Sequence, residues 1–267
     1  MKKIISVLFL SLSVCLCSFA QHPLYGTWKM ISIKGISAEG EKFAADTSTI
    51  RELKVITPTH YMLIAEDVEN DSLVFNRCYF GTIKIDGDNY NEMPILSSNT
   101  IFTNVKTDFK WKVIGDKFIQ SGTIIRPDGK KVVLEELVFQ RVKSAHSYPK
   151  NATNGTWRLL SSSYVGTDGK QRTDTDDTVT CYQLLTPTHW MYVSSRANKF
   201  ERAMGGPYTM KGDKYALDLD VASFPKNFWG ETEVTQKLTG NKVRSTGISK
   251  FDDGKKFTWD DSFEKVK

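Results

Sequence analysis

The stretch Gly26-Thr27-Trp28 returns 129 residues later as Gly155-Thr156-Trp157. The same spacing separates Thr57-Pro58-Thr59-His60 from Thr186-Pro187-Thr188-His189. Further along, Gly-Asp-x-Tyr, Gly-Asp-Lys or Gly-Asn-Lys, and Asp-Gly-Lys-Lys recur in the same order, 125 residues apart. An ordered set of landmarks at a nearly constant spacing is the mark of an internal duplication. The sequence therefore predicts two copies of one domain in tandem.

Each copy has the pattern of a succession of short strands. Runs rich in β-branched and aromatic residues are separated by turn pairs such as Asp86-Gly87 and Asp128-Gly129, and no stretch shows the apolar period of a helix. We expect strands near 26–33, 50–56, 60–66, 73–84, 89–95, 108–114, 117–125 and 131–141, and in the second copy near 155–164, 178–185, 189–195, 206–211, 214–220, 231–238, 242–250 and 255–265.

Eight consecutive strands in a small domain predict how each copy folds. The expected fold is all-β, with two tandem eight-stranded up-and-down barrels, because closure removes the exposed edges of an open sheet. A β-sandwich is the competing architecture. We place the barrels at 21–143 and 155–267, joined by a polar linker at 144–154 that contains Pro149.

Residues 1–20 have the features of a secretory signal peptide. Two lysines precede an apolar run, and Ser18-Phe19-Ala20 is a small-x-small cleavage pattern. A retained membrane anchor needs about 20 apolar residues, and the residues before Cys15 and Cys17 do not fit a lipoprotein site. We therefore expect export to the periplasm or the medium, without stable membrane insertion.

The composition is that of an ordinary globular protein. Hydrophobic residues make up 40% of the 267 residues and charged residues 25%, with a formal net charge of +5. Basic and acidic residues are spread evenly over the two halves, so no basic arm predicts a nucleic-acid partner. These values exclude a disordered chain, a multi-span membrane protein and a long coiled coil, and they leave the oligomeric state open.

The sequence lacks the motifs of common catalytic sites. It has no Gly-x-Ser-x-Gly, His-Glu-x-x-His, glycine-rich phosphate loop or Cys-x-x-Cys. The adjacent acids Glu135-Glu136 and Asp260-Asp261 point to opposite faces of a strand and cannot work as a pair. We predict no metal, no cofactor and no catalytic residue. Cys78 and Cys181 remain after loss of the leader. They could form a disulfide or be two buried thiols, and the sequence leaves both alternatives open.

Gly-x-Trp at the start of the first strand resembles the signature of lipocalins and other calycins. The fuller string, with Thr-Pro-Thr-His, Gly-Asp-x-Tyr and Glu-Glu-Leu, looks like small secreted lipocalin-like domains of unknown function from gut-type bacteria, over residues 24–267. The resemblance implies that Trp28 and Trp157 plug the barrel bases, with Arg141 and Lys265 packed on them. In the second copy Trp-Asp-Asp replaces Glu-Glu-Leu, so a ligand shared by both copies is not implied.

His60 and His189 are the strongest candidates for ligand binding. Each follows Thr-Pro-Thr and precedes an aromatic residue and a methionine. An imidazole inside a barrel can hydrogen-bond a ligand and titrate near neutral pH. The alternative is a histidine that caps the turn by bonding a neighbouring carbonyl.

Alternation along the later strands supplies the other candidates. Apolar residues with a few polar atoms share one face on several strands, and this pattern describes a ligand cavity and a filled barrel equally well. The complete set of predicted ligand-binding residues is His60, Met62, Trp111, Gln120, His189, Trp190, Gln236 and Trp259.

These observations favour a secreted, non-enzymatic binding protein for a small, largely apolar or aromatic molecule. One alternative is an envelope protein-interaction module with filled barrels, which would show an exposed aromatic patch. Another is a calycin-type isomerase or hydrolase, in which His60 or His189 and a second titratable group line a cavity. The sequence does not identify the ligand.

Overall fold

The structure, a computed structural model, describes residues 22–226 and 229–267. The predicted signal peptide at 1–20 lies outside the described residues. In the described part of the chain the regular structure is β-strand, apart from short 3-10 turns such as η1 (Thr100–Phe102). No helix there is long and apolar enough to cross a membrane. The prediction of an all-β fold is confirmed.

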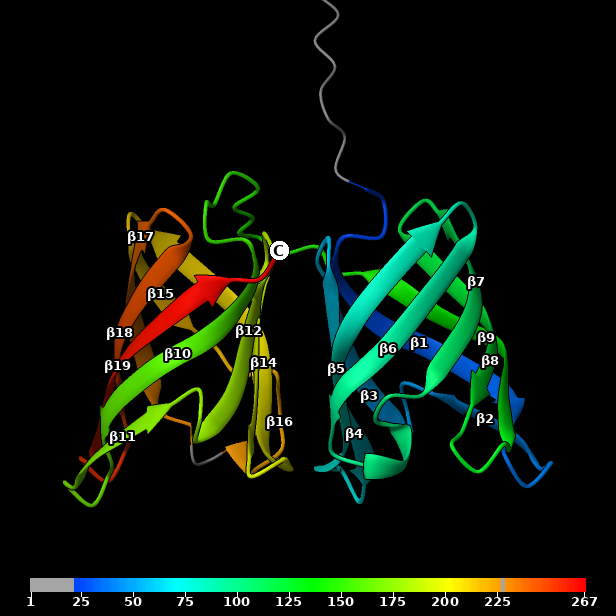
Figure 1. Cartoon of the computed structure of the whole chain (residues 1–267), viewed down its shortest axis with the longest axis horizontal. Helices are drawn as coiled ribbons and strands as arrows, with labels where there is room; N and C mark the ends of the chain where they lie inside the picture. The colour runs from blue at the N-terminus through cyan, green and yellow to red at the C-terminus, as the bar shows by residue number, and fades with distance from the viewer. Residues whose placement is uncertain (1–21, 227–228) are drawn as a thin grey trace, which may run out of the picture.

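The first half of the chain forms a closed antiparallel barrel, barrel 1 (Figure 1). Its strands are neighbours in sequence order, and the first pairs with the last. They are β1 (Gly26–Ile36), β3 (Ile50–Ile56), β4 (His60–Glu69), β5 (Ser72–Asp86), β6 (Asn89–Ser97), β7 (Lys106–Ile114), β8 (Lys117–Ile125) and β9 (Lys131–Arg141).

The second half repeats this architecture as barrel 2, closed by pairing of its first and last strands. The predicted pair of eight-stranded up-and-down barrels is therefore confirmed. The strands of barrel 2 are β10 (Gly155–Val165), β12 (Val179–Leu185), β13 (His189–Arg196), β14 (Lys199–Lys211), β15 (Lys214–Leu217), β17 (Glu231–Thr239), β18 (Lys242–Lys250) and β19 (Lys256–Lys265).

Three further strands were not predicted: β2 (Lys42–Asp46), β11 (Gln171–Thr175) and β16 (Val221–Ala222). The first strand of each barrel pairs with an additional strand, which is β2 in barrel 1 and β11 in barrel 2. β1 pairs with β3 as far as Lys29 and with β2 from Ser32 onward, and a β-bulge lies between Met30 and Ser32. β10 has the equivalent bulge. A bulge bends a strand and increases its twist, which turns its second half toward a new neighbour.

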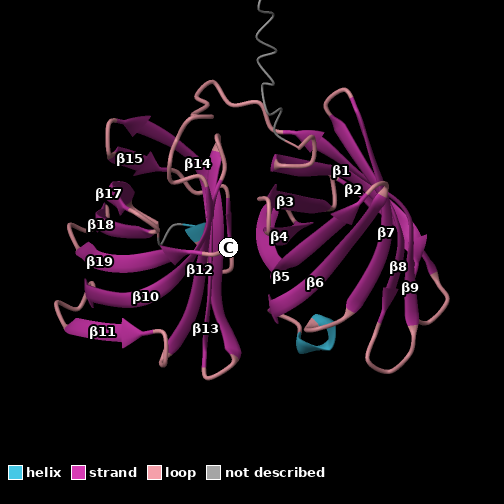
Figure 2. Ribbon diagram, turned by 45° about the horizontal axis from the view of Figure 1, so that its top comes forward, coloured by secondary structure: helices cyan, strands magenta, loops and turns pink. Residues whose placement is uncertain are grey.

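Hydrophobic side chains form three clusters, one inside each barrel and one between the barrels. The inter-barrel cluster explains why β4 is buried on both faces from His60 to Glu66, since one face points into barrel 1 and the other toward barrel 2. Figure 2 shows β4 and β5 beside β12, β13 and β14. The cluster consists of Leu53, Val55, Met62, Ile64, Cys78, Phe80, Leu96, Leu184, Met191, Val193, Ala203 and Val221.

The contact between the barrels repeats itself about an approximate two-fold axis. The hydroxyl of Thr27 lies 2.8 Å from that of Thr186, and Thr57 lies 2.8 Å from Thr156. Thr27 and Thr156 are equivalent in the repeat, as are Thr57 and Thr186. Each barrel thus offers the same surface to the other, as the subunits of a two-fold dimer do.

Aromatic and charged side chains complete this interface. Phe75 and Phe200 occupy equivalent places beside the bulges of β5 and β14, and their rings stack on each other at 5.5 Å. Glu66 accepts hydrogen bonds from the Lys226 ammonium and from the Ala222 amide, both at 3.0 Å. The two barrels therefore share an interface of apolar, aromatic and charged contacts.

Candidate functional site

The interior of barrel 2 contains a cavity of about 810 Å³. Its wall is formed mainly by inward-facing residues of β10, β12, β13, β18 and β19 and by the segment before β17. The lining includes three arginines and three acids, and besides them it includes several aromatic rings, a few uncharged polar groups and one further carboxylate. Among the latter are Tyr164, Trp190, Tyr192, Trp229, Phe257, Trp259 and Phe263, with Ser162, Gln183, Ser245, Ser249 and Asp261.

The interior of barrel 1 is occupied by its own side chains. The ammonium of Lys54, whose side chain is 1% exposed, donates hydrogen bonds to the Glu92 carboxylate and, at 3.2 Å, to Gln120 Oε1. Aromatic rings surround this ammonium with centroids 5.2–5.8 Å away, those of Tyr61, Tyr90, Phe118 and Phe139. A second ion pair, Arg77 to Glu52 at 2.8 Å, lies farther along the interior.

Equivalent positions in the two sheets explain why one barrel is filled and the other is hollow. Lys54 lies opposite Trp28, and Gln183 lies opposite Trp157 in the same register. The ion-paired or bulky residues of barrel 1 are replaced by uncharged or smaller ones at most of these sites, while one leucine becomes an acid. The replacements are Ile33 by Ser162, Glu52 by Cys181, Lys54 by Gln183, Glu92 by Leu217, Phe118 by Val243, Gln120 by Ser245, Ile124 by Ser249 and Leu137 by Asp261.

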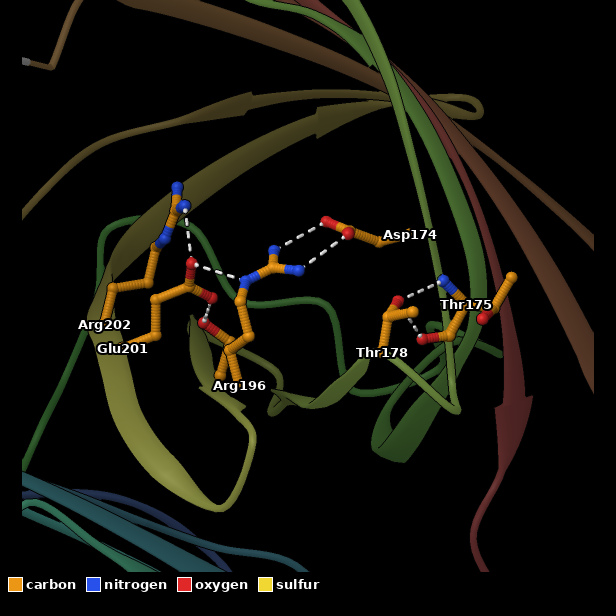
Figure 3. Close-up of polar contacts among 7 residues, drawn as sticks. Asp174, Thr175, Thr178, Arg196, Glu201 and Arg202 are labelled. Carbon is orange, nitrogen blue, oxygen red and sulfur yellow. Dashed lines mark hydrogen bonds and ion pairs between the residues drawn. The ribbon is translucent and has the colours of Figure 1, made fainter.

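A network of charged residues lines one end of the cavity (Figure 3). Arg196 binds both carboxylate oxygens of Asp174, at 2.9 and 3.0 Å, and contacts Glu201 at 3.4 Å. Arg202 lies 3.6 Å from the same glutamate. Because Arg196 binds Asp174, the pKa of that carboxyl is lowered. Asp174 comes from β11, one of the strands that the sequence did not reveal.

Asp261 is the acid inside barrel 2. On β19 it lies opposite Ser162 of β10 and Ser245 of β18. Burial raises its pKa to about 7, and a hydrogen bond with Ser162 opposes that rise. Its Oδ1 is buried and has no hydrogen-bond partner among the described residues. The preceding residue, Asp260, points outward and binds Arg244 at 2.5 and 2.8 Å.

A buried tryptophan lies at the start of each barrel. Trp28 and Trp157 are 0% and 1% exposed, and each indole donates to a backbone carbonyl, at 2.8 and 2.7 Å. The guanidinium carbon of Arg141 lies 4.0 Å from the Trp28 ring centroid. The ammonium of Lys265 lies 5.4 Å from that of Trp157. Both distances are in the range of cation–π contacts.

Of the ligand-binding residues predicted in the second copy, Trp190 and Trp259 line the cavity. Trp190 stacks on Trp229 with ring centroids 5.5 Å apart. Gln236 also lies inside barrel 2, opposite Ser245, but it is not part of the cavity lining. The structure thus brings two of the predicted aromatic residues together in one site.

The predicted residues Gln120 and Trp111 belong to barrel 1. Gln120 is buried and accepts its hydrogen bond from Lys54. Trp111 is half-buried, donates to the Gly87 carbonyl at 3.0 Å and packs 5.3 Å from His22. Both side chains are therefore engaged with the protein itself.

The structure places His60, Met62 and His189 in the interface between the barrels, outside the barrel 2 cavity. The His60 ring stacks on Phe80 at 5.3 Å and lies 6.4 Å from Tyr182 of the other barrel. Burial lowers the pKa of His60 to about 4, and burial with the nearby Lys29 charge lowers that of His189 to about 3. Neither imidazole therefore titrates near neutral pH as the sequence suggested.

Asp261 and Gln183 are the main residues of this site that sequence reasoning missed. The replacement of Glu-Glu-Leu by Trp-Asp-Asp was visible and marked the place where the copies differ. Alternation along the last strand places Asp261 on the same face as Trp259 and Phe263, but Asp261 was not included among the predicted ligand-binding residues. The replacement of Lys54 by Gln183 also marked a difference between the two interiors. It becomes visible only when the two copies are aligned residue by residue.

Among the described residues neither the two cysteines nor a cluster of metal-ligating side chains forms a site. Cys78 and Cys181 are free and buried, one between the barrels and one inside barrel 2. Among residues 22–226 and 229–267 no group of three His, Cys, Asp or Glu side chains is placed to hold a metal ion.

No family model and no curated protein matches the chain. Among solved structures, an uncharacterised Saccharomyces cerevisiae protein is 11% identical over 87% of this chain and 84% of its own, with a TM-score of 0.41. Kievitone hydratase from Nectria haematococca is 9% identical over 90% and 88%, with a TM-score of 0.23. A double mutant of transferrin-binding protein B from Haemophilus parasuis is 7% identical over 90% and 76%, with a TM-score of 0.29.

Proposed function

We propose that this protein binds a small, largely apolar or aromatic molecule in the cavity of barrel 2, and that barrel 1 is a packed partner domain. The observation that carries the proposal is the difference between the two interiors at equivalent positions. Where barrel 1 has Lys54 and Gln120 in its interior, barrel 2 has Gln183 and Ser245 beside a cavity of about 810 Å³.

The size and lining of the cavity suit this role. Ligand sites in proteins typically occupy about 300–1,000 Å³ and combine an apolar wall with a few polar groups. The barrel 2 cavity lies in that range, with Trp190, Trp229 and Trp259 among the wall residues. The charged network of Arg196, Asp174 and Glu201 is confined to one end.

The position of the histidines supports binding over catalysis. The enzyme alternative requires His60 or His189 beside a second titratable group in a cavity. Both histidines are held between the barrels, each 2.8–2.9 Å from a threonine hydroxyl. Because residues 1–20 have the pattern of a signal peptide, we further propose that binding takes place after export, in the periplasm or the medium.

The experiment is a fluorescence titration with N-phenyl-1-naphthylamine, a neutral aromatic reporter that brightens in apolar surroundings. We expect one site per chain. A triple variant with Ser162→Ile, Ser245→Gln and Ser249→Ile gives barrel 2 the residues that barrel 1 has at those places, and it should weaken binding at least 10-fold.

The matched control is Thr246→Gln, which enlarges the exposed neighbour of Ser245 on the outer face of β18. This variant should bind like the original chain. Absence of binding to the original chain, or equal binding by the triple variant in its folded state, would refute the proposed site.

A further inference from the structure

We propose that the ligand of barrel 2 carries a protonated amine on its aromatic or apolar body, and that the Asp261 carboxylate binds this ammonium. The inference rests on the proposed function and names the class of molecule that the same cavity selects. Four observations carry it: the unsatisfied carboxylate oxygen, the balance of charge in the lining, the surrounding rings and the interior of barrel 1.

The carboxylate of Asp261 is held in place, and one of its two oxygens has no hydrogen-bond partner among the described residues. Its backbone is paired on both sides, with β10 through Ser162 and with β18 through Ser245. Oδ1 is buried, accepts no hydrogen bond from the described residues and belongs to a side chain that lines the cavity. A buried oxygen without a donor is costly, and a ligand donor would remove that cost.

The charges in the cavity lining leave one acid without a cation. Three arginines and four acids line it. Each arginine contacts an acid, in the pairs Arg172–Asp168, Arg196–Asp174 and Arg202–Glu201. Asp261 is the fourth acid, and no cation contacts it among the described residues. A ligand with one positive charge would balance the negative charge that remains in the cavity lining.

The rings beside Asp261 suit an ammonium with an aromatic body. Trp259 lies two residues before Asp261 on the same face of β19, and its ring is 5.6 Å from that of Phe257. Tyr164 extends this row, 5.7 Å from Phe257. Aromatic faces attract cations, most strongly where water is excluded.

In the interior of barrel 1 a comparable ion pair is formed by two side chains of the protein itself. There the ammonium is that of Lys54, its carboxylate is Glu92 and its surroundings are four aromatic rings. In barrel 2 the lysine is replaced by Gln183 and the acid is supplied from a different strand by Asp261. An amine-bearing ligand would restore to barrel 2 the ion pair that barrel 1 builds from its own chain.

The pKa of Asp261, raised to about 7 by burial, agrees with this assignment. A bound cation favours the ionised carboxylate. The ligand would therefore bind with loss of the proton that the empty site retains below neutral pH.

The test uses the full chain and three probes with one indole body: tryptamine, which is cationic, tryptophol, which is neutral, and indole-3-acetate, which is anionic. Calorimetry at pH 8 should show tryptamine binding at least 10-fold more tightly than tryptophol, with indole-3-acetate the weakest. Asp261→Asn should weaken tryptamine at least 10-fold and change tryptophol less than twofold.

Asp260→Asn is the control, because it removes the neighbouring charge on the outer face of the same strand. It should leave the tryptamine preference intact. Equal affinity for tryptamine and tryptophol, or an equal effect of Asp261→Asn on both, overturns the assignment. If none of the indoles binds while N-phenyl-1-naphthylamine does, the proposal of an amine ligand is refuted and the proposed binding cavity is retained. If the reporter also fails, the proposed function fails with it.

Discussion

The two barrels have the same strand order and the same register at their tryptophans, yet one interior is filled and the other is hollow. In barrel 1 Lys54, Glu92 and four aromatic rings occupy the interior, and in barrel 2 Gln183 and Leu217 stand at the places of the ion pair. Because side chains alternate along a strand, inward residues change without altering the outer face. A duplicated barrel can therefore keep the surface that joins it to its partner and change its interior.

The largest expected effect comes from breaking the ion pair of barrel 1. Lys54→Ala leaves Glu92 buried without its cation, and such a loss costs about 3–5 kcal/mol. The equivalent change in barrel 2, Gln183→Ala, removes no charge and should cost about 1 kcal/mol or less. Urea denaturation of the two variants measures the difference.

A double variant serves as the control for this comparison. Lys54→Gln with Glu92→Leu installs the residues of barrel 2 and removes both charges together, so it should cost far less than Lys54→Ala. Equal losses for Lys54→Ala and Gln183→Ala would show that the ion pair does not distinguish the two interiors.

The second prediction concerns the interface that both barrels share. Phe80 packs 4.2 Å from Tyr182 across it, and barrel 2 has Gly205 at the place equivalent to Phe80. Phe80→Ala should cost about 3 kcal/mol, as deletion of a buried ring does. Because the contact is shared, amide exchange should accelerate in β12 as well as in β5. Acceleration confined to barrel 1 would mean that the barrels are energetically independent.

The third prediction is a gain in stability from Asp261→Leu. A carboxyl whose pKa is raised in the folded state stabilises it only at low pH, and this stabilisation is lost as pH rises through about 7. The variant should therefore gain about 1–3 kcal/mol at pH 8 and less at pH 5. The ionisable groups near Asp261 are Asp174, Asp260, Cys181 and Tyr192, none of them cationic.

The reverse substitution at the equivalent position of barrel 1 provides a comparison for this prediction. Leu137→Asp introduces the acid at the equivalent place in barrel 1, where the interior is already packed, and it should destabilise the protein at pH 8. Thermal melts at pH 5 and 8 for both variants provide the readout. A loss of stability for Asp261→Leu at pH 8 would show that the acid is satisfied in the native state.

The last prediction is a weakening of the interface in acid. Because burial lowers the folded-state pKa of His60 and His189 below 6.5, the unfolded chain binds more protons between pH 6.5 and about 4. Stability should therefore fall over that window, by about 1.4 kcal/mol for each pH unit and each histidine that stays neutral in the folded state. The double variant His60→Phe, His189→Phe should show a flatter dependence of melting temperature on pH. An unchanged slope would assign the acid sensitivity to other groups.

Sequence alone was sufficient for the duplication and for sixteen barrel strands, because turn pairs and β-rich runs recur in both copies. It did not predict β2 or β11, since their existence depends on the bulges of β1 and β10. A bulge shifts the register by one residue and has no distinct residue signature here.

The candidate site was harder to predict for a related reason. Along β4 the residues from His60 to Glu66 are all buried, so apolar alternation does not reveal which of them face the barrel interior. Met62 belongs to the interface, whereas Tyr61 belongs to the interior. Whether a barrel is hollow depends on the summed volume of inward residues on several strands, which requires the register of all of them.

The most direct measurement is a crystal structure of the full chain grown with tryptamine. The account predicts density for one molecule inside barrel 2, with its ammonium within about 3 Å of the Asp261 carboxylate, as a charge-assisted hydrogen bond requires. It also predicts that the interior of barrel 1 keeps the Lys54–Glu92 pair and takes no ligand. Density inside barrel 1, an ammonium bound among Arg196, Asp174 and Glu201 instead, or an empty barrel 2 would contradict it.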